Sequence, residues 1–208
     1  MLIHETEIDG VLLIEPRVFG DARGFFMELW NQERYQAAGL DATFVQDNLS
    51  RSRQGTLRGL HFQNPHPQGK LVFVLEGEVF DVAVDIRPDS PTFGRWVGYT
   101  LSAENCRQVY IPPGLAHGFY VTSETALLVY KCTDFYRPGC EGAIAWNDPQ
   151  LAIPWPVSDP LLSERDRNAP LLRDVPRERL IVPDAAWTGS VAPRHVGRVT
   201  GPRLNQQT

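Results

Sequence analysis

The chain has 208 residues, 42% hydrophobic and 22% charged, which suits one globular domain with a sizeable core and argues against a second full domain. Its formal net charge of -5 argues against a protein that coats nucleic acid, because such proteins carry a basic surface. Three cysteines without Cys-x-x-Cys spacing indicate neither a disulfide framework nor a zinc knuckle.

The N-terminal segment, residues 1–11, carries Glu5, Glu7 and Asp9 where a signal peptide would need a basic and then an apolar run. No stretch of the sequence is long and apolar enough to span a membrane. We therefore expect a cytoplasmic protein with reduced thiols and with neither a membrane nor a nucleic-acid partner.

Short apolar or alternating runs, separated by Gly, Pro, Asn and Asp, fill the chain from residue 11 to residue 146. This pattern is typical of an antiparallel sandwich or barrel, so we predict an all-β fold. The predicted strands are residues 11–14, 25–30, 44–50, 57–62, 70–75, 79–86, 95–101, 108–111, 118–122, 126–132 and 142–146.

Two short helices are predicted. Asn31 can cap the first, residues 32–38, and Gly39 can end it. Ser163 begins the second in a variant capping box that places Asp166 at the third helical position, so spacing alone makes Asp166 a helix-start residue. After about residue 183 the sequence is rich in Pro, Gly, Thr and Arg with few large apolar residues. We therefore expect a single domain over residues 1–182 and a mobile or surface-draped tail over residues 183–208.

His61 is the strongest candidate for chemistry. In a strand its side chain shares a face with Gly59, which leaves open space, so His61 either lines a cavity or is a half-buried histidine bonded to a backbone carbonyl. Arg58 lies on the opposite face of a regular strand. A bulge or bend at Gly59 would bring Arg58 and His61 to the same side.

His117 ends a Pro-x-Gly-x-x-His pattern, the second signature of cupin barrels, in which this histidine often binds a metal. Metal-binding cupins also have a His-x-His pair followed by glutamate, a set of ligands that suits iron, manganese or nickel. Here the first signature reads His61, Phe62, Gln63, and Pro67 or Gln68 replaces the glutamate. We therefore expect no bound metal.

Without a metal, a histidine in a cavity is best suited to act as a general base. Lys70 offers a positive charge where an oxyanion could form, although an exposed charge at a strand entrance is the simpler interpretation. Tyr130 alternates with Leu128 and Cys132, so it is either a core tyrosine or a phenol that delivers a proton.

Seven motifs in order resemble the dTDP-4-dehydrorhamnose 3,5-epimerase family over residues 21 to about 172. They are Asp21-Ala22-Arg23-Gly24-Phe25, Phe44-Val45-Gln46-Asp47-Asn48, Leu57-Arg58-Gly59-Leu60-His61, the run from Gly77 to Arg87, Ser90-Pro91-Thr92-Phe93-Gly94, the run from Gly114 to Phe119, and Leu162-Ser163-Glu164-Arg165-Asp166. The resemblance implies a metal-free cupin jelly-roll barrel and a homodimer. It also implies an isomerase that needs no cofactor.

The implied substrate is a dTDP-linked 4-keto-6-deoxy sugar, epimerised at carbons 3 and 5 through an enolate. His61 would be the base, Asp166 its hydrogen-bond partner, Tyr130 the acid, and Lys70 the group that stabilises the enolate oxygen. The resemblance further implies that residues around the nucleotide sugar are Gln46, Asp47, Asn48, Arg58, His117, Glu141 and Arg165. From the partner subunit, Arg23, Phe26 and Glu28 would reach the nucleotide.

Three alternatives stay open on the sequence. A relative that inverts only carbon 3 or only carbon 5 would keep the same base and acid. A metal-dependent cupin enzyme would use His61 and His117. A sugar-nucleotide binding module without catalysis would need only the arginines and aromatic residues.

Overall fold

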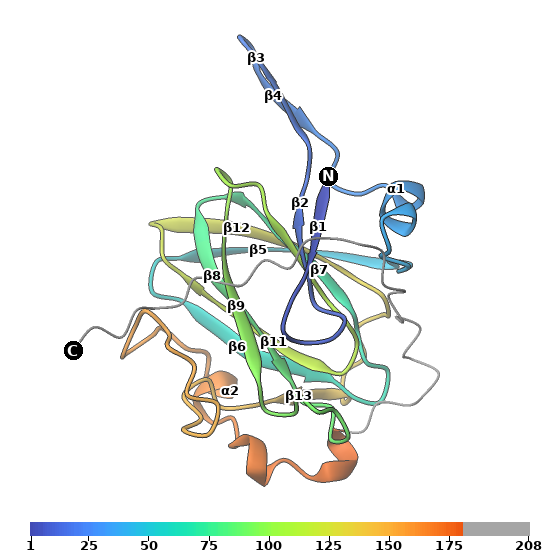
Figure 1. Cartoon of the computed structure of the whole chain (residues 1–208). Coiled ribbons are helices and arrows are strands. Elements are labelled where there is room, and N and C mark those ends of the chain that lie inside the picture. Colours follow the sequence, from blue (N-terminus) through green and yellow to red (C-terminus); the bar gives the residue numbers. More distant parts are fainter. Residues whose placement is uncertain (181–208) are drawn as a thin grey trace, which may run out of the picture.

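Two antiparallel sheets packed face to face form the body of the protein in this computed structural model, which describes residues 1–180 (Figure 1). The six-stranded sheet has the order β1-β2-β10-β7-β12-β5, and the five-stranded sheet has the order β13-β6-β11-β8-β9. Within the described residues, strands β3 and β4 pair only with each other. The predicted all-β fold is confirmed, whereas the tail expected over residues 183–208 lies outside the described residues.

The strands of the first sheet are β1 (Leu2–Glu5), β2 (Leu12–Glu15), β10 (Gln108–Ile111), β7 (Lys70–Glu76), β12 (Thr125–Cys132) and β5 (Gln46–Arg53). Those of the second are β13 (Glu141–Ala143), β6 (Leu57–Gln63), β11 (Leu115–Val121), β8 (Glu78–Asp85) and β9 (Trp96–Ser102). The hairpin is β3 (Val18–Asp21) and β4 (Gly24–Met27). The helices are α1 (Gln32–Ala37), α2 (Glu164–Arg167) and the 3-10 turns η1 (Leu172–Asp174) and η2 (Arg177–Arg179).

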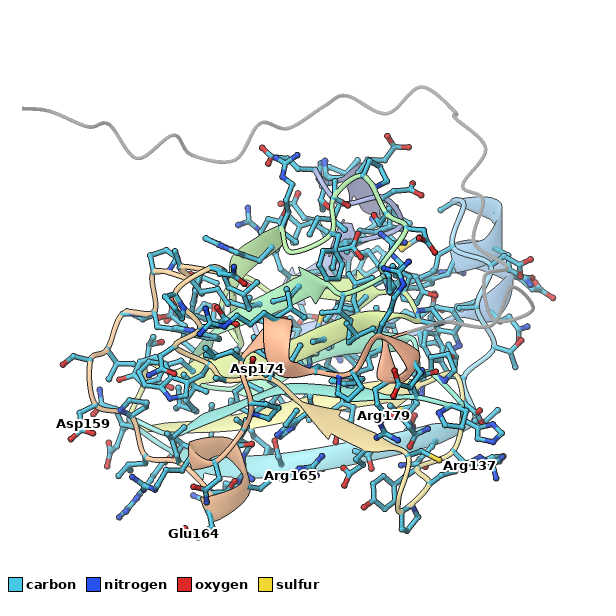
Figure 2. The ribbon with its side chains drawn as sticks, turned by 90° about the horizontal axis from the view of Figure 1, so that it is seen from below. Arg137, Asp159, Glu164, Arg165, Asp174 and Arg179 are labelled. Carbon is cyan, nitrogen blue, oxygen red and sulfur yellow. The ribbon has the colours of Figure 1, made fainter. Side chains whose placement is uncertain are left out.

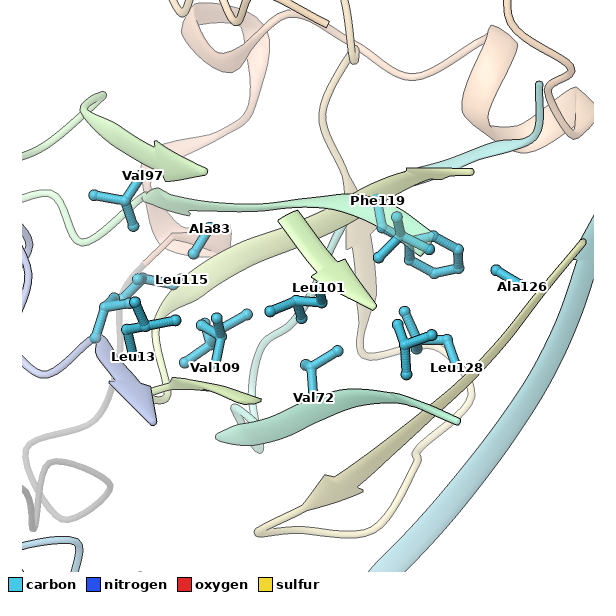
Figure 3. Close-up of a cluster of buried hydrophobic side chains, with 14 of the residues drawn as sticks. Leu13, Val72, Ala83, Val97, Leu101, Val109, Leu115, Phe119, Ala126 and Leu128 are labelled. Atoms are coloured by element: carbon cyan, nitrogen blue, oxygen red, sulfur yellow. The ribbon is translucent and has the colours of Figure 1, made fainter. Parts of the chain in front are cut away.

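The main core lies between the two sheets, where the inward side chains of each strand interdigitate (Figure 3). Val72 and Leu128 come from the six-stranded sheet, and Ala83 and Phe119 from the five-stranded one. Fully burying a Val, Leu or Phe side chain stabilises the fold by about 1.5–3 kcal/mol. The close packing of these side chains sets the distance between the two sheets.

A second apolar cluster covers the outer face of the five-stranded sheet. Leu60, Val82 and Ala116 on that face pack against residues from the C-terminal part of the chain, among them Trp155 and Leu180. The orange segment of Figure 1 follows this face. The sheet that carries β6 is therefore buried on both sides.

The β3–β4 hairpin projects from the body (Figure 1). Its two strands are exposed except for half-buried Met27, with Phe25 62% and Phe26 69% accessible. Strand β3 was not predicted, because an exposed strand has no buried face to impose alternation. Strand β1 was not predicted either.

No described helix is long and apolar enough to cross a membrane.

Candidate active site

A polar pocket opens between the two sheets. Its lining residues come from β5, β6, β7, β12 and β13 and from nearby loops: Gln46, Asn48, His61, Phe62, Gln63, Gln68, Lys70, Tyr130, Tyr136 and Glu141. Among the residues predicted to be catalytic, His61, Lys70 and Tyr130 line it directly. His61 reaches it from the five-stranded sheet, whereas Lys70 and Tyr130 belong to the six-stranded one.

A bulge in β6 sets the direction of His61. His61 pairs with His117 on β11, whereas Arg58 pairs with Phe119, so three steps along β6 match two along β11. His117 and Phe119 share a face because they are two residues apart, and their partners Arg58 and His61 therefore share it too. The bend predicted at Gly59 is confirmed.

Only glycine fits at position 59. Its φ is +126°, and a Cβ there would lie 2.5 Å from the Cα of Gly118 and 2.8 Å from the carbonyl oxygen of His117. The close approach of two backbones at Gly59 and Gly118 is what allows β6 to bulge against β11.

Asp166 holds His61 in place. Its Oδ1 atom lies 2.5 Å from Nε2 of His61, and its side chain is only 3% exposed while that of His61 is 33% exposed. The predicted capping role is also confirmed, because the backbone N–H of Asp166 donates to Oγ of Ser163 at 3.1 Å. The helix start therefore aims a buried carboxylate at the imidazole.

The charge of Asp166 is favoured in this setting. Burial raises its pKa, but the hydrogen bond and charge of His61, together with the Ser163 hydrogen bond and the charge of Arg165, outweigh burial and lower the pKa below 3.8. An ionised carboxylate can only accept, so Nε2 of His61 carries the proton that it donates. Nδ1 is then the basic atom of the ring.

Lys70 is half-buried beside Tyr130, with Nζ 5.8 Å from the centroid of its ring. Among the described residues, its ammonium group has no hydrogen-bond or ion-pair partner. Desolvation lowers the pKa of Lys70. The charges of Cys132, Asp81 and Glu141 raise it, but by less than desolvation lowers it. A cation held this way can bind an anionic oxygen that enters the pocket.

Tyr130 stands across the pocket from the base, on β12. Burial raises its pKa above 10.0, with smaller contributions from Cys132, which raises it, Arg58, which lowers it, and Glu141, which raises it. The hydroxyl makes no hydrogen bond to any residue in the described part of the chain. Tyr130 is thus a protonated phenol available to a ligand, and it is not the fully satisfied core tyrosine that was the simpler alternative.

Glu141 joins two groups at the rim of the pocket. Its Oε2 accepts from Nη1 of Arg165 at 2.6 Å and from the hydroxyl of Tyr136 at 3.1 Å. On the opposite wall, Nε2 of Gln46 donates to Oδ1 of Asn48 at 3.0 Å. The rim therefore presents a carboxylate paired with a guanidinium group, together with amides and a phenol hydroxyl, which suits a polar ligand that makes several hydrogen bonds.

A family model described as dTDP-4-dehydrorhamnose 3,5-epimerase matches residues 5–174. The dTDP-4-dehydrorhamnose 3,5-epimerase of Pseudomonas aeruginosa is 59% identical over 169 residues, which cover 80% of this chain and 93% of that protein. The chain belongs to the dTDP-4-dehydrorhamnose 3,5-epimerase family.

Solved structures agree with this assignment. The dTDP-6-deoxy-D-glucose-3,5-epimerase of Legionella pneumophila, in complex with dTDP-4-keto-L-rhamnose, is 55% identical with a TM-score of 0.84 and covers 86% of this chain and 97% of that chain. A 3'-monoepimerase from Streptomyces bikiniensis, in complex with dTDP-quinovose, is 39% identical with a TM-score of 0.81. The match covers 88% of this chain and 94% of that chain. The predicted cupin-type jelly roll is confirmed by these likenesses.

Some residues that the epimerase family likeness assigns to the substrate are not among the residues that line this pocket. His117 is buried, and its Nε2 lies 2.7 Å from Oδ2 of Asp81 inside the barrel. Asp47 is exposed and pairs with Lys131 at 2.7 Å. The alternation of β5 directs Asp47 to the side opposite Gln46 and Asn48.

The hairpin residues also lie outside the pocket. Arg23 pairs with Asp21 on the exposed hairpin, Phe26 is exposed beside it, and Glu28 pairs with Arg34 at 3.2 Å. Arg58 donates to Oγ of Ser52 at 3.0 Å near Tyr130. Their contacts with a nucleotide stay predictions.

Gln63, Gln68 and Tyr136 line the pocket but were not predicted as ligand contacts. Gln63 and Gln68 were considered only as substitutes for metal ligands. Tyr136 follows β12 in a segment without periodicity, so nothing in its local sequence marks it. Within residues 1–180, no group of three or more His, Cys, Asp or Glu side chains is arranged to hold a metal ion.

Proposed function

We propose that this chain is a cofactor-independent epimerase that inverts a dTDP-linked 4-keto-6-deoxyhexose at carbons 3 and 5. The observation that carries the proposal is one pocket in which the His61–Asp166 pair from one sheet faces Lys70 and Tyr130 from the other. Hydrogens on carbons 3 and 5 are both adjacent to the carbon 4 ketone. Removal of either one therefore gives an enolate with its charge on the same oxygen.

Nδ1 of His61 takes the hydrogen from carbon 3 or carbon 5 as a proton, and the electron pair of the C–H bond moves into the enolate. Asp166 stabilises the imidazolium that forms. Lys70 donates a hydrogen bond to the enolate oxygen. Tyr130 then donates its proton to the other face of the carbon, which inverts the centre. Solvent takes the extra proton from the imidazolium of His61 and returns a proton to the phenolate of Tyr130.

The placement of base and acid on opposite sheets supports this division of roles. A sugar ring between the sheets presents one face to His61 on β6 and the other to Tyr130 on β12. Removal of a proton from one face and delivery to the other is what inversion requires.

Incubation with the dTDP-linked keto sugar in heavy water tests the proposal. Deuterium at both carbons is expected, detected by proton NMR of the product. Label at one carbon alone would select the single-centre alternative, which the likeness to the 3'-monoepimerase keeps in view. Ligand-dependent stabilisation without any label would select the binding module.

The metal-dependent alternative has a separate test. Elemental analysis of the purified protein, and activity after treatment with a chelator, are expected to show no stoichiometric metal and no loss of rate. The described residues also place His61 and His117 in no group of three or more His, Cys, Asp or Glu side chains that could hold a metal ion.

We further propose a cytoplasmic homodimer in which the β3–β4 hairpin meets the partner subunit. The exposed rings of Phe25 and Phe26, and a hairpin that pairs with no other strand of the described chain, support this proposal. In the dimer, Arg23, Phe26 and Glu28 would contact the nucleotide held by the partner. Analytical ultracentrifugation of wild type and Phe26→Ser tests it, with a shift of the variant toward monomer as the expected result.

A further inference from the structure

The strand that carries Glu141 to the pocket is short and lies at a sheet edge. β13 has three residues and pairs on one side with β6, where Ala143 lies opposite His61 and Glu141 opposite Gln63. In the described part of the chain, the strand order places no other strand on its second side. An edge strand of this length gains little from its own pairing, so other contacts must hold it.

Residues 176–180, which we call the C-terminal strap, supply such contacts. Nη2 of Arg179 donates to the backbone carbonyl oxygen of Glu141 at 2.8 Å and approaches that of Cys140 at 3.5 Å. Arg179 and Arg165 are both labelled in Figure 2, the view from below. Arg165 donates a hydrogen bond to the side chain of Glu141, and Arg179 donates one to its backbone carbonyl oxygen.

The strap is itself fastened to the end of β6. Nδ2 of Asn64 donates to the carbonyl oxygen of Arg179 at 3.0 Å and to that of Glu178 at 3.3 Å. The backbone N–H of Asn64 donates to the carbonyl oxygen of Cys140 at 2.8 Å. Leu180 is 5% exposed and packs into the outer apolar cluster. Strap, β13 and the end of β6 thus form one hydrogen-bonded unit.

We propose that Arg179 is a positioning residue of the active site, which holds the β13 backbone so that Glu141 meets the substrate at the pocket rim. This inference rests on the proposed function and deepens it. The match to the family model ends at residue 174, so the C-terminal strap lies outside the matched part of the chain. Arg179 is not one of the residues that line the pocket, and it acts through the backbone of Glu141.

Steady-state kinetics of Arg179→Ala separates positioning from chemistry. The base, the acid and Lys70 are untouched, so kcat should stay near the wild-type value. KM for the dTDP-linked keto sugar should rise about fivefold, the change in an equilibrium constant that the loss of one hydrogen bond produces. Arg179→Lys, which keeps a donor near the carbonyl oxygen, should recover part of the affinity.

Arg177→Ala is the matched control. Arg177 lies in the same 3-10 turn but pairs with the exposed carboxylate of Asp89 at 2.7 Å. KM and kcat should both match wild type. The melting temperatures of all three variants should be measured alongside, so that a loss of folded protein is recognised.

Hydrogen–deuterium exchange gives a readout that does not depend on turnover. Arg179→Ala should speed exchange over β13 and at Leu60 and Ile144, whose backbones bond each other at 2.9 and 3.1 Å, and leave the six-stranded sheet unchanged. KM and exchange equal to those of Arg177→Ala would overturn the proposal. So would a global loss of protection that Arg179→Lys does not restore.

The two proposals fail separately. Wild-type protein that does not label the sugar at either carbon would reject the epimerase reaction, while local exchange over β13 would still support the strap. Normal labelling with unchanged exchange and KM in Arg179→Ala would reject the strap alone.

Discussion

Replacement of Asp166 by asparagine keeps the size of the side chain and removes its charge. In the wild-type protein the buried carboxylate lies 2.5 Å from Nε2 of His61. The imidazolium that forms when His61 takes a proton would lose this partner. Two unit charges about 4 Å apart interact by about 4 kcal/mol at an effective dielectric constant of about 20. A barrier raised by that amount slows the reaction about 10³-fold.

Deuterium incorporation at carbons 3 and 5, followed by NMR over time, measures this loss in Asp166→Asn. The fold should survive, because the cap of α2 uses the backbone N–H of residue 166 and Oγ of Ser163. Glu164→Gln is the control, since the Glu164 side chain is 88% exposed on the same helix. A rate for Asp166→Asn within tenfold of wild type, in folded protein, would refute the reasoning.

The same pair predicts a change in acid stability. The folded-state pKa of Asp166 lies below the ordinary value of 3.8, so the ionised group stabilises the fold above that pH, and this contribution is lost as pH falls through the folded-state pKa. Wild type should therefore lose more of its unfolding free energy than Asp166→Asn below pH 3.8. Denaturant unfolding at a series of pH values measures the difference.

Tyr130→Phe should still take up deuterium but form inverted product about 10²-fold more slowly, because the phenol proton is missing while the ring remains. Lys70→Met should lower kcat about 10²–10³-fold through loss of the oxyanion partner. Wild-type kcat should also fall on an alkaline limb below pH 10.5, since desolvation lowers the pKa of Lys70, and Lys70→Arg should lack that limb. Gly59→Ala should lower the unfolding free energy by about 3 kcal/mol or more, because its Cβ would overlap the backbone of Gly118.

Each of these predictions has a result that contradicts it. Full inversion by Tyr130→Phe would remove its role as the acid. An alkaline limb unchanged in Lys70→Arg would assign that limb to another group. Gly94→Ala provides the control for position 59, because Gly94 has φ +74° but no atom of residues 1–180 lies within 4 Å of an added Cβ. If Gly59→Ala and Gly94→Ala lower the unfolding free energy equally, backbone strain at a positive φ explains the whole effect. Overlap of the Cβ with the backbone of Gly118 would then contribute nothing.

Much of the fold followed from local patterns. Strand 108–111 was predicted with its observed bounds, and Asn31 caps α1 as expected, with its side chain accepting from the N–H of Arg34. β11 begins at Leu115, three residues earlier than predicted, so His117 lies inside a strand instead of before one. Residues 112–114 separate β10 from β11, and the pairing of β11 with β8 begins at Leu115.

The site was harder to predict because it depends on register. Spacing alone placed Arg58 and His61 on opposite faces, and only the pairing of β6 with β11 shows where the extra residue sits. Asp166 reads as a helix-start residue, which it is, and nothing local reveals that its carboxylate meets a histidine 105 positions away. The family likeness implied the contact between His61 and Asp166, whereas the local sequence pattern could not predict it.

The two reacting groups stand on different sheets, so the gap between them is a property of hydrophobic packing and not of either strand. Val72, Leu128 and Phe119 act as spacers for that gap. Trimming a spacer such as Leu128, even without touching a polar atom, would alter how far a proton must travel on each side of the sugar. We therefore expect stereochemical fidelity to depend partly on the buried apolar side chains between the two sheets.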